Sequence, residues 1–404
     1  MIYGLLGEKL GHSLSPEIHA FFGDYPYRLF ETERDGIDDF IKNKDLAGFN
    51  VTIPYKKEII SRLDRIDPIA ERIGAVNTAV KENGKWVGYN TDYYGFSETL
   101  RRAGISVENK KVLVLGSGGA SAAVKAYSED NAADFKVVSR NGDVNYRNVY
   151  ELKDTEIIIN ATPVGMFPRV PERLLDLSRF PKLSAAVDLI YNPRKTLFLF
   201  DAEKLGVKAV NGLSMLVFQA AKAHDLFCGK KVSESKITEC VKLLDRTGKN
   251  VVLIGMSGSG KTVIAEELAL ITGRPVFDTD KETEKLAGKS IPDIFKDEGE
   301  TVFRKYESEV IKTLSGRRGI IIATGGGAVT VPENEYPLKS NGVIFRIVRE
   351  KDKLERKDRP LAVDDAAFDR LLKEREPLYE RFADFTVNND GSVSSAAEKI
   401  TEKL

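Results

Sequence analysis

Residues 251–262 read VVLIGMSGSGKT, an apolar strand-like run followed by a glycine-rich loop that ends in Lys261 and Thr262. The next residues, VIAEELALITG, have the apolar spacing of a helix that ends at Gly273. The loop fits the pattern G-x-x-x-x-G-K-[ST] at every position, and in such loops backbone N–H groups surround phosphate oxygens. This stretch therefore predicts a nucleoside triphosphate site on a strand–loop–helix unit.

The chemistry of that loop assigns a task to each position. The backbone of Gly258, Ser259 and Gly260 is expected to curl around phosphates, and Lys261 to reach the β- and γ-phosphates. The hydroxyl of Thr262 is suited to Mg²⁺. The run PVFDTD follows and places Asp278 and Asp280 at the end of a second strand, where one carboxylate can serve the metal and the other an acceptor hydroxyl.

A second unit of the same kind lies upstream, where residues 110–127 read KKVLVLGSGGASAAVKAY. Gly116, Gly118, Gly119 and Ala120 form a dinucleotide-type loop between strand and helix. The next predicted strand ends in Ser139 and Arg140 instead of an acidic residue. Because arginine suits a 2′-phosphate and an acid suits a free ribose hydroxyl, this end favours NADP(H) over NAD.

The bulk properties are those of an ordinary globular enzyme. A chain of 404 residues predicts roughly two to four domains. The 61 basic and 61 acidic residues give zero net charge, which provides no general attraction to nucleic acid or anionic membrane. Two cysteines without a CxxC predict neither disulfides nor a zinc site. With no signal-like or membrane-spanning run, we expect a cytoplasmic protein.

Buried apolar runs alternate with helical stretches from Lys110 onward, which predicts an α/β fold with mostly parallel sheets. The pattern restarts at residues 246–250, so we expect a short linker there.

The C-terminal part resembles shikimate kinase. After the P-loop and D-x-D it carries SIPDIFKDEGETVFRKYESE, a triple glycine, an R-P-L lid segment and an R-x-P-L-Y helix. The resemblance implies ATP, Mg²⁺ and shikimate as ligands. It implies that Asp280 orients or deprotonates the attacking hydroxyl, that Asp278 and Thr262 serve Mg²⁺, and that Arg304 and Arg375 hold the substrate carboxylate. Gly325, Gly326 and Gly327 would let the substrate approach the backbone.

The same resemblance assigns lid and pocket residues. Arg359 would swing in from the lid toward the transferred phosphate, and Arg356 is our choice for stacking on adenine. Phe295, Phe303 and Glu307 would support the pocket. The lid, from about residue 349 to 361, is several residues shorter than the family pattern leads us to expect.

In the N-terminal part the motifs GHSLSPEIH, FNVTIPYK, GAVNTAV and YNTDYYGF precede the glycine loop, and NATPVGM, DLIYNPRKT and NGLSMLVFQAA follow it. With this ordered set, the part resembles shikimate dehydrogenase. Together with the kinase resemblance, this implies a substrate-binding domain at 1–101 plus 213–246, a Rossmann-like NADP-binding domain at 102–212, and a P-loop kinase domain with a parallel sheet at 247–404. The resemblance implies that Lys56 and Asp92 form the catalytic pair for reduction of 3-dehydroshikimate to shikimate. The substrate would be held by Ser13, Ser15, Thr52, Asn77, Tyr191 and Gln219. Asp92 precedes a helix, so a capping role is compatible with catalysis.

Two alternatives remain open. The cofactor clamp reads Ser139-Arg140-Asn141 and lacks a second arginine, which allows an NAD-preferring quinate or shikimate dehydrogenase. The short lid and altered clamp also allow one half to be a non-catalytic regulatory module, although the reactive residues are retained. The sequence does not indicate an oligomeric state.

Overall fold

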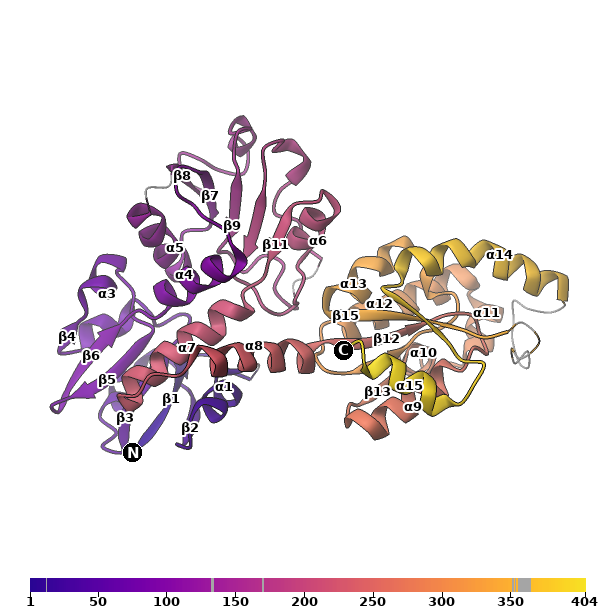
Figure 1. Cartoon of the computed structure of the whole chain (residues 1–404), viewed down its shortest axis with the longest axis horizontal. Coiled ribbons are helices and arrows are strands. Elements are labelled where there is room, and N and C mark those ends of the chain that lie inside the picture. The colour runs from indigo at the N-terminus through magenta and orange to yellow at the C-terminus, as the bar shows by residue number, and fades with distance from the viewer. Residues whose placement is uncertain (12, 132–133, 169–170, 351, 353, 355–364) are drawn as a thin grey trace. The chain divides into compact units, whose positions relative to one another are not determined.

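A computed structural model of the chain describes residues 1–11, 13–131, 134–168, 171–350, 352, 354 and 365–404, with the side chains of 365–368 left aside. The chain divides into two compact units. The first comprises residues 1–166 and 172–244, and the second comprises 167–171 and 245–404. Three sheets organise these units, two in the first and one in the second (Figure 1).

The first sheet is mixed and has the strand order β2-β1-β3-β5-β6-β4. Its strands are β1 (Ile2–Gly7), β2 (Tyr27–Glu31), β3 (Leu46–Val51), β4 (Arg65–Ile66), β5 (Thr78–Glu82) and β6 (Lys85–Tyr89). The β5–β6 hairpin turns on Asn83 and Gly84, both with positive φ, as a two-residue Asn-Gly turn requires. The helices near it are α1 (Ser15–Phe22), α2 (Ile37–Ile41), α3 (Pro68–Ile73), α4 (Asp92–Ala103), α7 (Leu213–Cys228) and α8 (Glu234–Gly248).

The second sheet is parallel, with the order β11-β10-β9-β7-β8. Its elements are β7 (Lys111–Leu115), α5 (Gly119–Asp130), β8 (Asp134–Val138), β9 (Ile157–Asn160), β10 (Ala185–Asp188), α6 (Leu197–Lys204) and β11 (Lys208–Val210). Apolar clusters cover both faces, which is why these strands read as continuous hydrophobic runs. The strand order reverses direction at β7, so a ligand crevice is expected at the carboxyl ends of β7 and β9.

The third sheet is also parallel, with the order β13-β14-β12-β15-β16. Its strands are β12 (Asn250–Ile254), β13 (Val276–Asp278), β14 (Ile321–Ala323), β15 (Gly342–Val348) and β16 (Phe385–Asn388). Its helices are α9 (Lys261–Thr272), α10 (Thr279–Ala287), α11 (Ile291–Asp297), α12 (Glu300–Ser315), α13 (Glu335–Asn341), α14 (Asp365–Phe382) and α15 (Val393–Thr401). Two buried clusters, one on each face, form its core.

The α/β class and the parallel sheets predicted after residue 110 are confirmed. Helix α14 contains Pro377 and runs on to Phe382, and the rings of Tyr379 and Phe382 are buried in the core. Helix α8 runs to Gly248, so only Lys249 separates it from β12.

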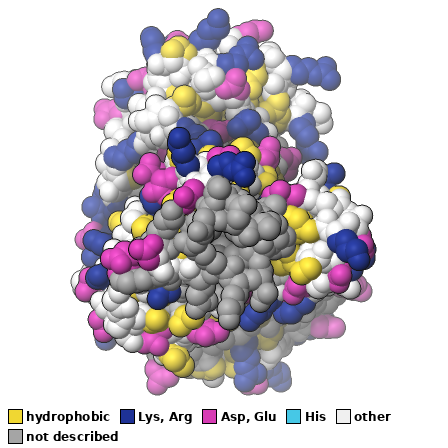
Figure 2. Space-filling view, turned by 90° about the vertical axis from the view of Figure 1, so that its right-hand side faces the viewer, with side chains coloured by type: hydrophobic (Ala, Val, Ile, Leu, Met, Phe, Trp, Pro, Cys, Tyr) yellow, Lys and Arg dark blue, Asp and Glu magenta, His cyan; other side chains and the backbone are white. Residues whose placement is uncertain are grey.

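The surface agrees with the balanced composition. On the face shown in Figure 2, basic and acidic side chains are interspersed among the described residues. None of the helices in the described ranges is both long enough and apolar enough to cross a membrane.

Candidate functional site

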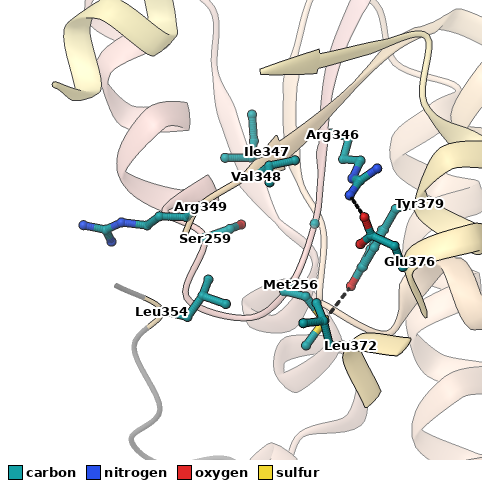
Figure 3. A pocket seen from close by; sticks show the side chains of 11 residues that line it. Met256, Ser259, Arg346, Ile347, Val348, Arg349, Leu354, Leu372, Glu376 and Tyr379 are labelled. Carbon is teal, nitrogen blue, oxygen red and sulfur yellow. Dashed lines mark hydrogen bonds and ion pairs between the residues drawn. The ribbon is translucent and has the colours of Figure 1, made fainter. Parts of the chain in front are cut away.

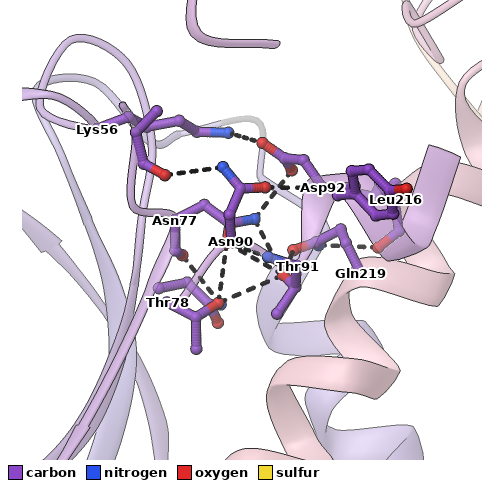
Figure 4. Close-up of polar contacts among 11 residues, drawn as sticks. Lys56, Asn77, Thr78, Asn90, Thr91, Asp92, Leu216 and Gln219 are labelled. Atoms are coloured by element: carbon purple, nitrogen blue, oxygen red, sulfur yellow. Dashed lines mark hydrogen bonds and ion pairs between the residues drawn. The ribbon is translucent and has the colours of Figure 1, made fainter. Parts of the chain in front are cut away.

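The predicted catalytic pair of the first unit is in direct contact. Lys56 Nζ lies 2.6 Å from Asp92 Oδ2, and the two side chains are 17% and 8% exposed (Figure 4). Lys56 follows β3, and Asp92 is the first residue of α4, where the helix dipole favours a carboxylate. Thr91 occupies the N-cap position, so the Asp92 carboxylate is directed to Lys56 and does not cap the helix. The structure thus holds an ammonium group against a buried carboxylate.

Asn77 completes this arrangement from the start of β5. Its Nδ2 donates to Asp92 Oδ1 at 2.9 Å, and its Oδ1 accepts from the backbone N–H of Thr91 at 2.7 Å. Gln219 reaches the same place from α7, since its Oε1 accepts from Thr91 Oγ1 at 3.3 Å (Figure 4). The fold therefore brings together four residues that lie far apart in the sequence, namely Lys56, Asn77, Asp92 and Gln219.

The other predicted substrate residues follow the ends of β1, β3 and β10. Ser15 is buried at the start of α1, and its N–H donates to Ser13 Oγ at 3.2 Å. Thr52 directly follows β3 and donates its N–H to Leu6 O at 3.0 Å. Tyr191 is half-buried and packs against the cluster formed with α1 and α7.

Asn50 belongs to the hydrogen-bond network around Thr78, and our sequence reasoning missed it. It is buried, accepts from Tyr27 Oη at 2.7 Å and donates to Thr78 Oγ1 at 2.9 Å. Asn50 stands two residues before Thr52 in FNVTIPYK, and alternate residues of a strand face the same side. That spacing was the sequence signal that could have identified it.

The glycine loop lies where the order of the second sheet predicts a ligand crevice. Gly116 has φ +106°, and a Cβ there would lie 2.9 Å from Thr162 Cγ2. Gly118 faces open space, and a Cβ at Gly119 would lie 3.6 Å from Lys56 Cδ. Gly119 and Ala120 open α5, so their N–H groups belong to a helix N-terminus suited to phosphate. The loop and the catalytic lysine are thereby adjacent.

The predicted cofactor-selecting residues follow β8. Ser139 donates its N–H to Val144 O at 3.1 Å, and Arg140 is exposed. The loop beyond them is compact, with Asn145 N–H donating to Asn148 Oδ1 at 2.8 Å and Asn148 Nδ2 donating to Asp143 O at 2.8 Å. Arg140 is therefore displayed from an ordered turn at the edge of the crevice.

The phosphate loop of the second unit has the geometry its sequence requires. Gly258 and Gly260 have φ +81° and +92°, conformations that favour glycine. Lys261 is buried, and its Nζ donates to the carbonyls of Gly255 and Met256, each at 2.9 Å. A further contact was not anticipated: Asn389, after β16, donates to Ser259 O at 2.8 Å. The loop is thus held from inside by Lys261 and from outside by Asn389.

The two acids after β13 have separate environments. Asp278 Oδ1 caps α10 by accepting from the N–H of Asp280 at 3.0 Å, and its Oδ2 accepts from Thr262 Oγ1 at 3.2 Å. Burial, reinforced by the charges of Glu307 and Asp278, raises the pKa of Asp280 to about 6. The pairing of a hydroxyl with a carboxylate oxygen suits Mg²⁺, and the raised pKa of Asp280 suits a proton acceptor.

Each glycine of the triplet faces a different part of the second site. A Cβ at Gly325 would lie 2.5 Å from Asp280 Oδ1, and one at Gly326 would lie 3.0 Å from the N of Ser257 in the phosphate loop. A Cβ at Gly327 would lie 2.0 Å from Arg304 Nη2. Three glycines are needed because a side chain at any of them would displace the acid, the loop or the arginine.

Arg304 is oriented by Glu307, whose Oε2 accepts from Arg304 Nη1 at 2.7 Å. Glu307 is fully buried, and Phe303 packs on Phe295 with ring centroids 4.9 Å apart, as expected for supports of a pocket. Arg375 is buried on α14. Arg356 and Arg359 lie outside the described residues.

Comparison with known proteins indicates the families to which the two parts of the chain are similar. A family model described as shikimate dehydrogenase substrate binding domain matches residues 5–79, and one described as shikimate kinase matches residues 257–404. Over 256 residues the chain is 41% identical to shikimate dehydrogenase (NADP(+)) of Clostridium perfringens, covering 58% of this chain and 94% of that protein.

Solved structures give the same result. A chorismate mutase/shikimate 5-dehydrogenase fusion protein from Clostridium acetobutylicum is 40% identical, with a TM-score of 0.59 over 60% of this chain and 97% of that one. A Thermus thermophilus shikimate 5-dehydrogenase in complex with NADP(H) and shikimate is 32% identical, with a TM-score of 0.55 over 60% and 99% of the two chains. The chain is an enzyme that belongs to the shikimate dehydrogenase family and continues into a shikimate kinase domain.

Proposed function

We propose that this enzyme catalyses two consecutive steps: NADPH-dependent reduction of 3-dehydroshikimate to shikimate, then ATP-dependent phosphorylation of the shikimate 3-hydroxyl. The observation that supports the proposal is that described residues of two reactive constellations lie together in one chain. Lys56, Asp92 and Asn77 are in contact in the first unit. Asp280 lies beside the glycine triplet, which also contacts Arg304 and the phosphate loop, in the second.

For the reduction, a bound NADPH supplies the hydride. Addition of hydride to a ketone leaves an alkoxide that must receive a proton. Lys56 is the donor, and Asp92 keeps its ammonium group in place at 2.6 Å. Asn77 fixes the other oxygen of the same carboxylate, so neither Lys56 nor Asp92 can turn away without breaking a hydrogen bond.

For the phosphorylation, Asp280 accepts the proton of the attacking hydroxyl while Arg304 and Arg375 bind the substrate carboxylate. The new bond joins the 3-oxygen to the γ-phosphorus, and ADP leaves with the bridging oxygen. Thr262 and Asp278 would hold Mg²⁺, because their oxygens are 3.2 Å apart and Mg²⁺ takes few protein ligands besides phosphate and water. When bound, Mg²⁺ supplies charge neutralisation on the phosphates.

The test is a coupled assay with 3-dehydroshikimate, NADPH and Mg-ATP, with the product identified by mass as shikimate 3-phosphate. Lys56→Ala should abolish only the reduction, and Lys261→Ala only the phosphorylation. The exposed lysines Lys57 and Lys281 provide controls, and their alanine variants should retain both activities. Loss of both steps in a folded single variant would contradict independent sites, and absence of either product from the unmodified enzyme would refute the proposal.

One observation supports a second candidate function for the first unit. Arg140 is the one arginine of the altered clamp Ser139-Arg140-Asn141, which leaves room for an NAD-preferring oxidation of quinate or shikimate. Turnover with NADP against NAD, and with shikimate against quinate, separates the two functions. A clear preference for NADP and shikimate excludes the second.

A further inference from the structure

Tyr379 joins the two loops between which phosphate must pass, and none of the roles considered above uses it. It lies on α14, is 1% exposed, and its hydroxyl donates to Gly326 O at 2.5 Å. The same hydroxyl lies 3.6 Å from Met256 Sδ at the start of the phosphate loop (Figure 3). The tyrosine thus touches the nucleotide loop and the acceptor loop with one atom.

Gly326 is the place where those loops meet. A Cβ added to Gly326 would lie 3.0 Å from the backbone N of Ser257, so the backbone of Gly326 lies directly against the phosphate loop. Its neighbours face the acceptor side, since Gly325 lies against Asp280 and Gly327 against Arg304. A shift of the Gly326 carbonyl would therefore move the proton acceptor and the carboxylate-binding arginine relative to the phosphates.

The hydroxyl is suited to act as a permanent donor. Burial raises the pKa of Tyr379 to about 12, so the proton stays on the oxygen throughout the working pH range of an enzyme. Around it lies a small cavity of about 30 Å³, lined among others by Gly255, Arg346 and Glu376. The Arg346–Glu376 ion pair holds β15 against α14 beside this cavity, which fixes the helix that carries the tyrosine (Figure 3).

We propose that Tyr379 is a positioning residue for phosphoryl transfer, which sets the distance between the phosphate loop and the acceptor through the Gly326 carbonyl. This inference rests on the kinase activity proposed above. In-line transfer draws most of its rate from positioning, so a loosened acceptor loop slows the chemical step even when both substrates bind. The tyrosine touches neither substrate in this role and acts through the glycine triplet.

The test is Tyr379→Phe, which keeps the buried ring and removes only the hydroxyl. Loss of the hydroxyl removes its hydrogen bond to Gly326 O and its interaction with Arg375, and it should lower the kinase kcat about 3–10-fold. The KM for shikimate should rise by a similar factor, while the KM for ATP changes less than about 2-fold, because Lys261 still holds the phosphate loop internally. Shikimate oxidation by the other unit should be unchanged and serves as an internal measure of enzyme concentration, while the folded fraction of the kinase domain is followed by calorimetry.

Tyr306→Phe on α12 is the matched control, since no hydrogen bond of its hydroxyl occurs within the described ranges; its kinetics should equal those of the unmodified enzyme. Unchanged kcat and shikimate KM in Tyr379→Phe would overturn the inference. The inference would also be overturned if the loss of kinase activity only matched the fraction of unfolded kinase domain. An equal rise in the KM values for shikimate and ATP at constant kcat would overturn it as well. Absence of kinase activity in the unmodified enzyme would instead refute the proposed function.

Discussion

Replacement of Asp280 by Asn should make the kinase domain more stable at neutral pH while abolishing its activity. The Asp280 carboxylate is largely buried beside two other acids, and its pKa is raised from 3.8 to about 6. In the unfolded chain the carboxylate returns to water and recovers its ordinary pKa. The raised pKa therefore makes folding less favourable once the pH exceeds the unfolded value, and the effect is complete above the folded pKa.

The sign and size of the effect follow from that shift. Below pH 3.8 the acid is protonated in both states, and its contribution to stability is fully present. As the pH rises from 3.8 through about 6, that contribution is lost. A shift of about 2 units corresponds to about 3 kcal/mol, so we expect Asn to stabilise the domain by roughly 1–3 kcal/mol at pH 7.5. At pH 4 the gain should nearly vanish.

Calorimetric unfolding without nucleotide or Mg²⁺ measures this directly. For a domain of this size the gain should raise the melting temperature of the kinase transition by about 3–10 °C at pH 7.5. Asp297→Asn, an exposed carboxylate at the end of α11, is the control and should give no such gain. A variant equal to or less stable than the unmodified protein at pH 7.5, or a gain that is independent of pH, would refute the reasoning.

Three further outcomes can be checked. Gly327→Ala should raise the shikimate KM of the kinase roughly 10–100-fold by displacing Arg304, whereas Gly391→Ala, which faces open space, should not. Arg140→Ala should raise the KM for NADP roughly 10–100-fold and change that for NAD much less. Burial lowers the pKa of His19 to about 3. His19 therefore stabilises the first unit above pH 6.5, and this contribution to stability is lost as the pH falls. The stability difference from His19→Asn, followed by Trp86 fluorescence, should shrink by at most about 3 kcal/mol between pH 7 and pH 4; no pH dependence would contradict it.

Much of this architecture could be predicted because its signals are local. The loops at Gly116 and Gly258 can be recognised from the spacing of their glycines between a strand and a helix. Parallel strands buried on both faces read as apolar runs, and the order of motifs sufficed to indicate two enzymes. These features depend on residues close together in the chain, which is why sequence patterns capture them.

What could not be predicted depends on contacts between distant segments. Tyr379 reaches Gly326 across 53 positions, and Asn389 reaches Ser259 across 130, with nothing near either residue to signal its partner. Asp278 illustrates a second limit, since one oxygen caps a helix while the other meets Thr262. A sequence indicates which residues are reactive, but the contacts that hold those residues in place come from segments that only the folded structure brings together.

The junction between α8 and β12 determines where the two parts of the chain can be separated. Lys249 and Arg246 offer their carbonyls to Arg274, and Gly248 accepts from the N–H of Gly319, so the end of α8 is hydrogen-bonded to the kinase domain. A cut that leaves the kinase domain intact would have to fall upstream of Asp245, and the kinase domain would then keep the last turn of α8.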